Sequence, residues 1–193
     1  DFFIDCTGFD SRLMNGALQD PFVDWSDRLL CDSAVAVRLP RGQITPPYTE
    51  ATALSAGWCW NIPLADSVGC GYVYSSAHQS RDEAWSELAR FTGLIDDESA
   101  QPRHLRMRVG RQQSFWRGNV LALGLAAGFM EPLESTGLHL TQVGIEWFLD
   151  HFPGIATGSK HADVYNRLMT GLYDEASDFV HLHYLLSKRS DTA

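Results

Sequence analysis

The feature that most constrains this chain is the segment from Gly124 to Gly137, with the sequence G-L-A-A-G-F-M-E-P-L-E-S-T-G. Hydrophobic and small residues lead into a turn, a carboxylate follows, and an apolar helical pattern extends from Leu138 to Phe152. Ser135 and Thr136 are residue types that commonly cap the start of a helix. The first amides of a helix lack intrahelical acceptors and lie at the positive end of its dipole. The segment therefore predicts a helix N-terminus that can bind a small anion.

Glu134 lies just ahead of this predicted anion site. A carboxylate beside a bound anion would be repelled, so we expect the Glu134 side chain to face a different cavity, where it can accept a proton. For an isolated E-S-T-G run, an ordinary helix start with a surface glutamate would be the simpler interpretation. The sequence of residues over the whole segment from Gly124 to Gly137 favours a functional site instead.

The remaining sequence predicts an α+β fold, mainly β over residues 1–124 and mainly helical over residues 125–193. Three strand patterns separated by turn residues predict an antiparallel meander, and a long amphipathic pattern predicts the final helix. A helix over 81–91 is expected to end at Gly93. The predicted strands are 2–6, 34–38, 49–55, 58–64, 71–76, 103–110 and 120–123, and the predicted final helix is 162–188.

Charge and composition exclude several classes of protein. The net charge is −9 and no basic run occurs, which argues against a nucleic-acid groove or an anionic membrane surface. Arg106, Arg108 and Arg111 form the one basic cluster, which we interpret as a solvated strand face, with contact to another domain as the alternative. The apolar stretches are too short to span a membrane. The four cysteines show no C-x-x-C spacing and are expected to be buried thiols in a reducing cytoplasm.

No metal site is predicted. His181 and His183 are two positions apart on a predicted helix, so their side chains point in different directions, and no third ligand is evident. Trp58 and Trp60 alternate along a predicted strand and so share one face, where two indoles usually fill a core.

Three motifs in the chain match those of one enzyme family. The run E-P-L-E-S-T-G at 131–137 resembles that of flavin-dependent tryptophan halogenases, within the wider F-x-x-P-x-x-S-x-G pattern of flavin halogenases. The run 58–63 resembles their W-x-W-x-I-P motif, which the resemblance places near the flavin. The run 5–9 resembles the D-x-T-G-F turn at which their chain returns to the flavin domain. The family-motif residues of the second run are Trp58, Trp60, Ile62 and Pro63.

The resemblance implies part of a FADH2-dependent halogenase. In that family a separate flavin reductase supplies the reduced FAD, which with oxygen converts chloride or bromide to hypohalous acid. A catalytic lysine then mediates halogenation of tryptophan or a related indole. Glu134 matches the catalytic glutamate, and Thr136 and Gly137 match the halide-binding positions. The positions that match flavin contacts are Leu125, Ser135 and Leu138.

The chain lacks two parts of that family's pattern. It has no G-x-G-x-x-G turn for the FAD pyrophosphate, and neither of its lysines, Lys160 and Lys188, has a matching context. We therefore expect residues 1–193 to be one incomplete piece of a two-part, FAD-dependent monooxygenase-like fold, truncated at both ends. The full-length enzyme is expected to be cytoplasmic, and a homodimer is compatible with it. A flavin-dependent monooxygenase that uses no halide and a non-catalytic isolated fragment remain as alternatives.

Overall fold

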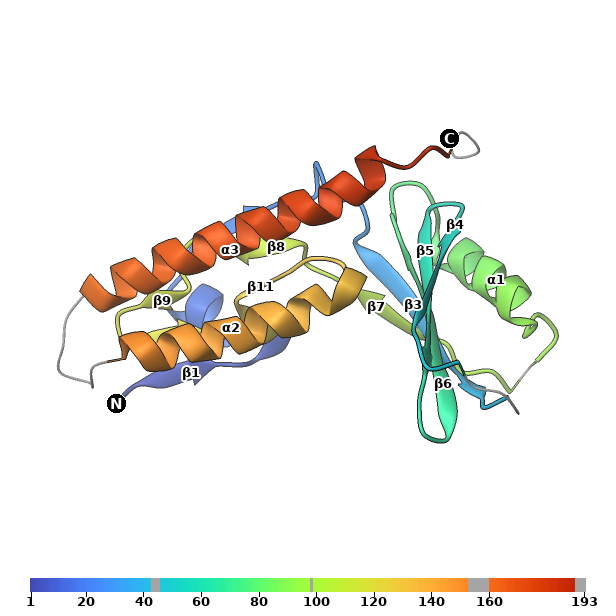
Figure 1. The fold of residues 1–193 in the computed structure, drawn as a ribbon, viewed down its shortest axis with the longest axis horizontal. Helices are drawn as coiled ribbons and strands as arrows, with labels where there is room; N and C mark the ends of the chain where they lie inside the picture. Colours follow the sequence, from blue (N-terminus) through green and yellow to red (C-terminus); the bar gives the residue numbers. More distant parts are fainter. Residues whose placement is uncertain (43–45, 98, 153–159, 190–193) are drawn as a thin grey trace. The chain divides into compact units, whose positions relative to one another are not determined.

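A computed structural model describes residues 1–42, 46–97, 99–152 and 160–189, which form two compact units (Figure 1). The first unit comprises Asp1–Leu29 and Arg108–Ser187, and the second is mainly Leu30–Met107. The first unit is therefore built from two separate stretches of sequence, with the second unit inserted between them.

The second unit contains a five-stranded antiparallel sheet in the order β4-β5-β6-β3-β7. Four of these strands, β3 to β6, lie near their predicted places in the chain. The meander of β4, β5 and β6 is confirmed. The bounds are Ser33–Pro40 for β3, Glu50–Leu54 for β4, Gly57–Pro63 for β5, Ser67–Tyr74 for β6 and Arg103–Arg106 for β7.

Helix α1 (Arg81–Thr92) packs against β3 and β6 and closes the core of the second unit. A capping box begins the helix: the Ser80 hydroxyl accepts a hydrogen bond from the Glu83 amide, and the Glu83 carboxylate accepts one from the Ser80 amide. Gly93, at φ 78°, ends it as predicted. The buried side chains between sheet and helix are Val35, Val37, Cys59, Cys70, Tyr72, Tyr74, Ala84 and Leu88.

The first unit holds two small sheets. In one, β1 (Phe3–Asp5) pairs in parallel with β10 (Val120–Ala122), which pairs with β9 (Trp116–Arg117). In the other, β8 lies between β11 and β2. The bounds of this second sheet are Phe22–Asp24 for β2, Gly110–Gln112 for β8 and Gly128–Phe129 for β11.

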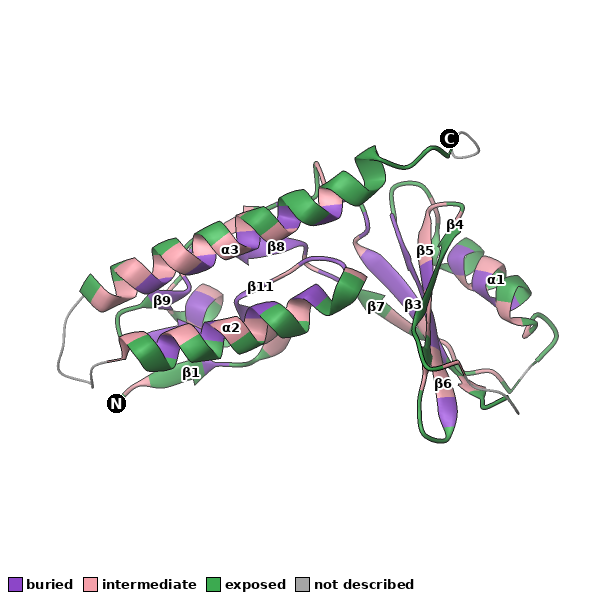
Figure 2. Cartoon of the chain, viewed as in Figure 1, coloured by how far each residue is buried: buried purple, intermediate pink, exposed green. Residues whose placement is uncertain are grey.

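Two long helices, α2 (Thr136–His151) and α3 (Lys160–Leu185), pack against each other in this unit. The buried residues of α2 recur every four positions and form one stripe (Figure 2). At Gly144 in that stripe, a Cβ atom would lie 3.2 Å from the Met169 side chain and 3.3 Å from the Tyr165 hydroxyl. Glycine therefore permits the close approach of the two helices, and the Tyr165 hydroxyl donates to the Gly144 carbonyl.

The predicted α+β class is confirmed. Two other interpretations are wrong, that of a strand over 103–110 and that of Arg111 as a solvated residue. The predicted strand ends at Arg106, and Gly110 begins a new strand in the other unit. Arg111 is buried rather than solvated, and its guanidinium forms two hydrogen bonds to the Asp174 carboxylate. Arg108 is half-buried, with its guanidinium 3.5 Å from the centre of the Phe22 ring. Within the described ranges, no helix is both long and apolar enough to cross a membrane.

Candidate active site

The turn before α2 has an unusual backbone. Glu134 (φ 52°, ψ 28°) and Ser135 (φ 57°, ψ 23°) are consecutive non-glycine residues in the left-handed region. Each such residue costs on the order of 1–2 kcal/mol, so surrounding contacts must hold the turn in place. Strain of this kind gathers at functional sites. Both residues are exposed, so the turn presents a carboxylate and a hydroxyl at the surface of its unit.

Hydrogen bonds fix this turn at both ends. The Leu133 amide donates to the Glu131 carbonyl over 2.8 Å, and the Thr136 hydroxyl donates to the Leu133 carbonyl over 2.6 Å. Glu131 is buried, and its carboxylate accepts a hydrogen bond from the Tyr184 hydroxyl on α3. The prediction of side-chain capping by Ser135 is wrong, because Ser135 makes no side-chain cap bond and Thr136 bonds back into the turn instead.

The start of α2 exposes backbone rather than side chain. Gly137 is half-buried, and among the described residues no atom lies within 4 Å of the position that a Cβ would occupy. The first amides of a helix that are not bonded within the turn can donate to an anion there. Thr136 is buried, whereas Leu138 is 77% exposed and Leu125 is 43% exposed. The Thr136 amide donates to the Leu133 carbonyl, so the first unit carries the exposed carboxylate, the start of α2 from Gly137 onward and two exposed leucines.

A buried polar network supports the segment that leads to this turn. Gln112 is fully buried, and its side-chain amide donates to the Ser11 hydroxyl, to the Asn15 side chain and to the Ala126 carbonyl. Phe9 meets Phe129 edge to face, with ring centres 5.4 Å apart. These contacts join the loop that follows D-x-T-G-F to residues 124–129. Gln112 could not be predicted as part of this network, because Ser11 and Asn15 lie about a hundred positions away in the chain.

Asp5 organises the D-x-T-G-F turn from within. One carboxylate oxygen accepts hydrogen bonds from the Thr7 amide and hydroxyl, and the other accepts from the Leu13 and Met14 amides. Burial opposes the charge, but the hydrogen bonds from Thr7, Met14 and Leu13 outweigh it and lower the pKa of Asp5. Asp5 is therefore a buried anion that holds the loop together.

The W-x-W-x-I-P motif lies on β5 in the second unit, so its surroundings are described there alone. Trp58 and Trp60 are half-buried with ring centres 6.3 Å apart, and Ile62 is 39% exposed. The buried core of this unit includes Cys59, on the opposite face of the strand, but neither indole. Trp60 lies over Gly71 on β6, where a Cβ would approach within 2.1 Å of the indole.

The cysteines are free, with Cys6 exposed and the other three buried. The thiols of Cys59 and Cys70 lie 3.6 Å apart, and their shared hydrogen bond raises the pKa of Cys59 and lowers that of Cys70. Among the described residues, no three His, Cys, Asp or Glu side chains lie where they could hold a metal ion.

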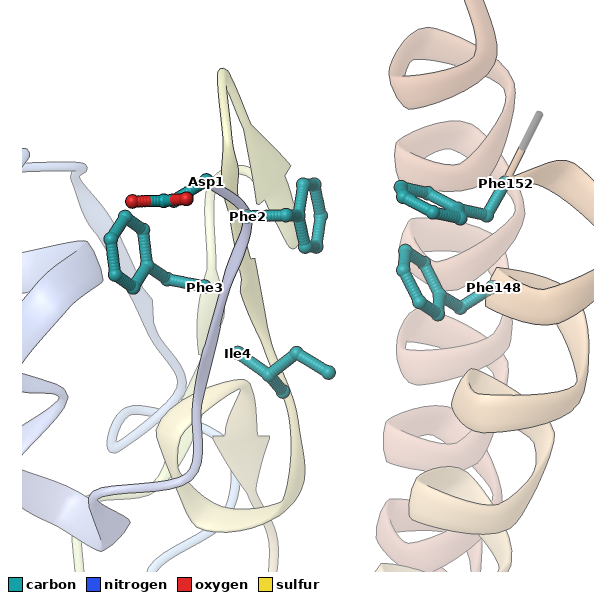
Figure 3. Close-up of a pocket in the computed structure, with 6 residues that line it drawn as sticks. All are labelled: Asp1, Phe2, Phe3, Ile4, Phe148 and Phe152. Carbon is teal, nitrogen blue, oxygen red and sulfur yellow. The ribbon is translucent and has the colours of Figure 1, made fainter. Parts of the chain in front are cut away.

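An apolar hollow of about 590 Å³ is separate from the turn (Figure 3). Phe2 and Ile4 of the first unit point toward Phe148 and Phe152, whereas Phe3 points to the other side of the strand. Phe148 lies twelve positions beyond Thr136, about 18 Å along the axis of α2. The hollow therefore contributes no group to the chemistry at Glu134.

The chain is similar to known proteins along its whole length. The family model described as tryptophan halogenase matches residues 1–193. Tryptophan 6-halogenase SttH of Streptomyces toxytricini is 43% identical over 198 residues, covering 100% of this chain and 37% of that protein. Tryptophan 7-halogenase RebH of Lentzea aerocolonigenes is 38% identical over 195 residues, with coverage of 100% and 37%.

The fold is also similar to that of a solved structure. The crystal structure of SttH is similar with a TM-score of 0.95 at 42% identity, covering 100% of this chain and 38% of that chain. The chain therefore spans little more than a third of the length of the relatives it matches.

Proposed function

Because the chain belongs to the tryptophan halogenase family, we propose that it is the part of a FADH2-dependent halogenase that contains the catalytic glutamate and the halide-binding helix start. The strained turn at Glu134 and Ser135 carries this proposal. Glu134 is exposed and directly precedes the first amides of α2, which supports an acid–base role for its carboxylate and anion binding by the amides. The relatives are named for tryptophan, and we propose tryptophan or a related indole as the substrate of the full-length protein.

The residues present fit the ring end of a flavin. Leu125 and Leu138 offer exposed apolar surface, and the open space at Gly137 is one that a side chain would fill. We assign Leu125, Ser135 and Leu138 to flavin contact and Thr136 and Gly137 to the halide. The bound flavin would supply the oxidising chemistry with oxygen. The W-x-W-x-I-P residues Trp58, Trp60, Ile62 and Pro63 are proposed to lie toward the flavin in the full-length protein.

Glu134 has a defined task in this proposal. When the ring carbon forms its bond to the halogen, the C–H bond at that carbon must break. The Glu134 carboxylate accepts the released proton, while its negative charge stabilises the cationic ring before the proton leaves. This requires an exposed carboxylate whose direction the backbone fixes.

The assignment extends to the partners of the full-length protein. We propose that a separate flavin reductase supplies the reduced FAD, that chloride or bromide is the halide, and that the protein works in the cytoplasm, with a homodimer compatible. We also propose that residues 1–193 act as one incomplete piece of the longer enzyme. No feature of the described residues favours a monooxygenase that uses no halide.

The test is Glu134→Gln in the full-length protein, which keeps shape but removes the charge. Flavin binding and flavin oxidation by oxygen should survive, while halogenated indole per flavin oxidised, measured by mass spectrometry, should fall about a hundredfold or more.

The matched control is Glu146→Gln. Glu146 is also exposed on α2 and contacts only the nearby Gln142 among the bonds described for its side chain. It should leave the yield unchanged. A near-wild-type yield from Glu134→Gln would remove Glu134 from the reaction.

A further inference from the structure

Glu131 occupies a different environment from Glu134, although the two lie in the same short motif. Glu131 is 1% exposed, whereas Glu134 is exposed. A buried carboxylate is costly unless hydrogen bonds stabilise it. The Tyr184 hydroxyl donates such a bond to Glu131 from a position 53 residues further along the chain.

This bond connects α3 to the upstream end of the strained turn. The Glu131 carbonyl accepts from the Leu133 amide, and Leu133 in turn accepts from Thr136 at the start of α2. Glu134 and Ser135 lie inside this set of bonds. Because left-handed residues relax when their surroundings loosen, the fixed ends decide whether the turn persists.

We propose that Tyr184 and Glu131 are positioning residues that hold the turn in the conformation presenting Glu134. Neither is assigned contact with the substrate. The Tyr184 hydroxyl anchors the Glu131 carboxylate, and the anchored Glu131 backbone fixes the direction in which the Glu134 side chain leaves the turn. The catalytic consequence of this inference rests on the proposed function, whereas the structural consequence does not.

The experiment uses Tyr184→Phe, Glu131→Gln and the double variant in the full-length protein. The phenylalanine keeps the ring and removes the hydroxyl, and glutamine keeps an acceptor and removes the charge. Hydrogen exchange of peptides spanning 131–137, followed by mass spectrometry, reports on the turn whether or not the protein halogenates. We expect faster exchange there in each single variant and less than the sum of the two increases in the double variant, because Tyr184→Phe removes the same link that Glu131→Gln weakens.

Turnover provides the second measurement. The kcat for halogenation should fall roughly ten- to a hundredfold, because misplacing a reacting group by about an ångström costs up to that much. The KM for tryptophan should stay near its original value, since the lost interaction is not one of substrate binding. The two single effects should not add in the double variant.

The matched control is Tyr165→Phe. Tyr165 also lies on α3 and donates its hydroxyl to a backbone carbonyl, that of Gly144 in the middle of α2. Removing that hydroxyl should lower the melting temperature while leaving exchange at 131–137 and kcat unchanged. An equal effect on the turn would mean that general loosening of α3 explains the result.

Three results would overturn the inference. They are unchanged exchange at 131–137 in Tyr184→Phe, unchanged kcat despite faster exchange, and additive effects in the double variant. If one variant does not fold, the other single variant decides by the same measurements. A wild-type protein that makes no halogenated product would reject the proposed function, and hydrogen exchange would still decide whether the pair fastens the turn.

Discussion

At the scale of single residues, the turn before α2 could be predicted from the sequence only in part. The position of Glu134 ahead of a helix can be predicted from the sequence, because the pattern of a helix start is local. The left-handed conformation of Glu134 cannot, because S-T after a carboxylate is also the pattern of an ordinary capped helix. The buried bond from Tyr184 to Glu131 and the bond from Thr136 to Leu133 override that local preference. The bond between Tyr184 and Glu131 joins residues 53 positions apart, so it leaves no signal in a local pattern.

Gly137 permits a prediction at the same scale. Gly137→Val in the full-length protein should weaken halide use about ten- to a hundredfold, because the side chain would fill the space beside the helix amides. The fold should survive, since nothing among the described residues lies within 4 Å of the new Cβ and the backbone is ordinary helix. The measurement is the dependence of product formation on halide concentration, with bound flavin followed by its absorbance.

A matched control exists on the other long helix. Gly171 is exposed on α3, and nothing described lies within 4 Å of its Cβ position either. Gly171→Val should therefore cost similar helix stability without affecting halide use. An unchanged halide dependence in Gly137→Val, with flavin still bound, would refute the assignment of Thr136 and Gly137.

At the scale of the elements, the Asp5 carboxylate joins β1 to the loop that follows it. Asp5→Asn should lower the free energy of unfolding by roughly 2–4 kcal/mol at neutral pH, because several hydrogen bonds to a buried charge are lost. The hydrogen bonds set the folded pKa of Asp5 below its usual 3.8, so this stability is present above that value and disappears as the pH falls toward the folded pKa. The melting temperatures of wild type and variant should therefore differ most near neutral pH and converge under acid conditions.

Asp10→Asn is the control for this prediction, because Asp10 lies a few residues away but is exposed and pairs with the exposed Arg12. It should change the melting temperature little at any pH. A constant difference between wild type and Asp5→Asn from neutral to acid pH would show that packing, and not charge, accounts for the role of Asp5.

The elements themselves were predictable to different degrees. The helix ended by Gly93 and the β4–β6 meander follow from local turn and capping residues, and both were predicted near their observed bounds. The stretch 103–110 was not, because its alternation continues through the point where the chain leaves one unit for the other. Arg111 looked solvated because its partner, Asp174, is 63 positions away. Alternation of apolar and polar residues predicts an extended chain. It does not predict which strands or side chains that chain contacts.

At the scale of the whole molecule, each unit carries a different part of the family's pattern. The turn at Glu134 and the D-x-T-G-F loop lie in the first unit, and W-x-W-x-I-P lies in the second. Neither contains a G-x-G-x-x-G turn, although such a turn supplies the amides that bind a dinucleotide's pyrophosphate. The flavin contacts proposed for this chain are therefore those to the ring, and neither unit offers such a turn for the phosphates.

The final prediction follows from that division. The 193-residue chain by itself should not retain FAD during gel filtration and should form no halogenated product with reduced flavin, oxygen, chloride and tryptophan. Exposed leucines and a few amides provide too little binding energy to hold a dianionic dinucleotide on a chain whose net charge is −9. The measurement is flavin absorbance in the protein peak, with the full-length protein as the control that should elute yellow. Stoichiometric flavin on the 193-residue chain would contradict the prediction. It would mean that the two units bind the pyrophosphate through groups other than a glycine-rich turn.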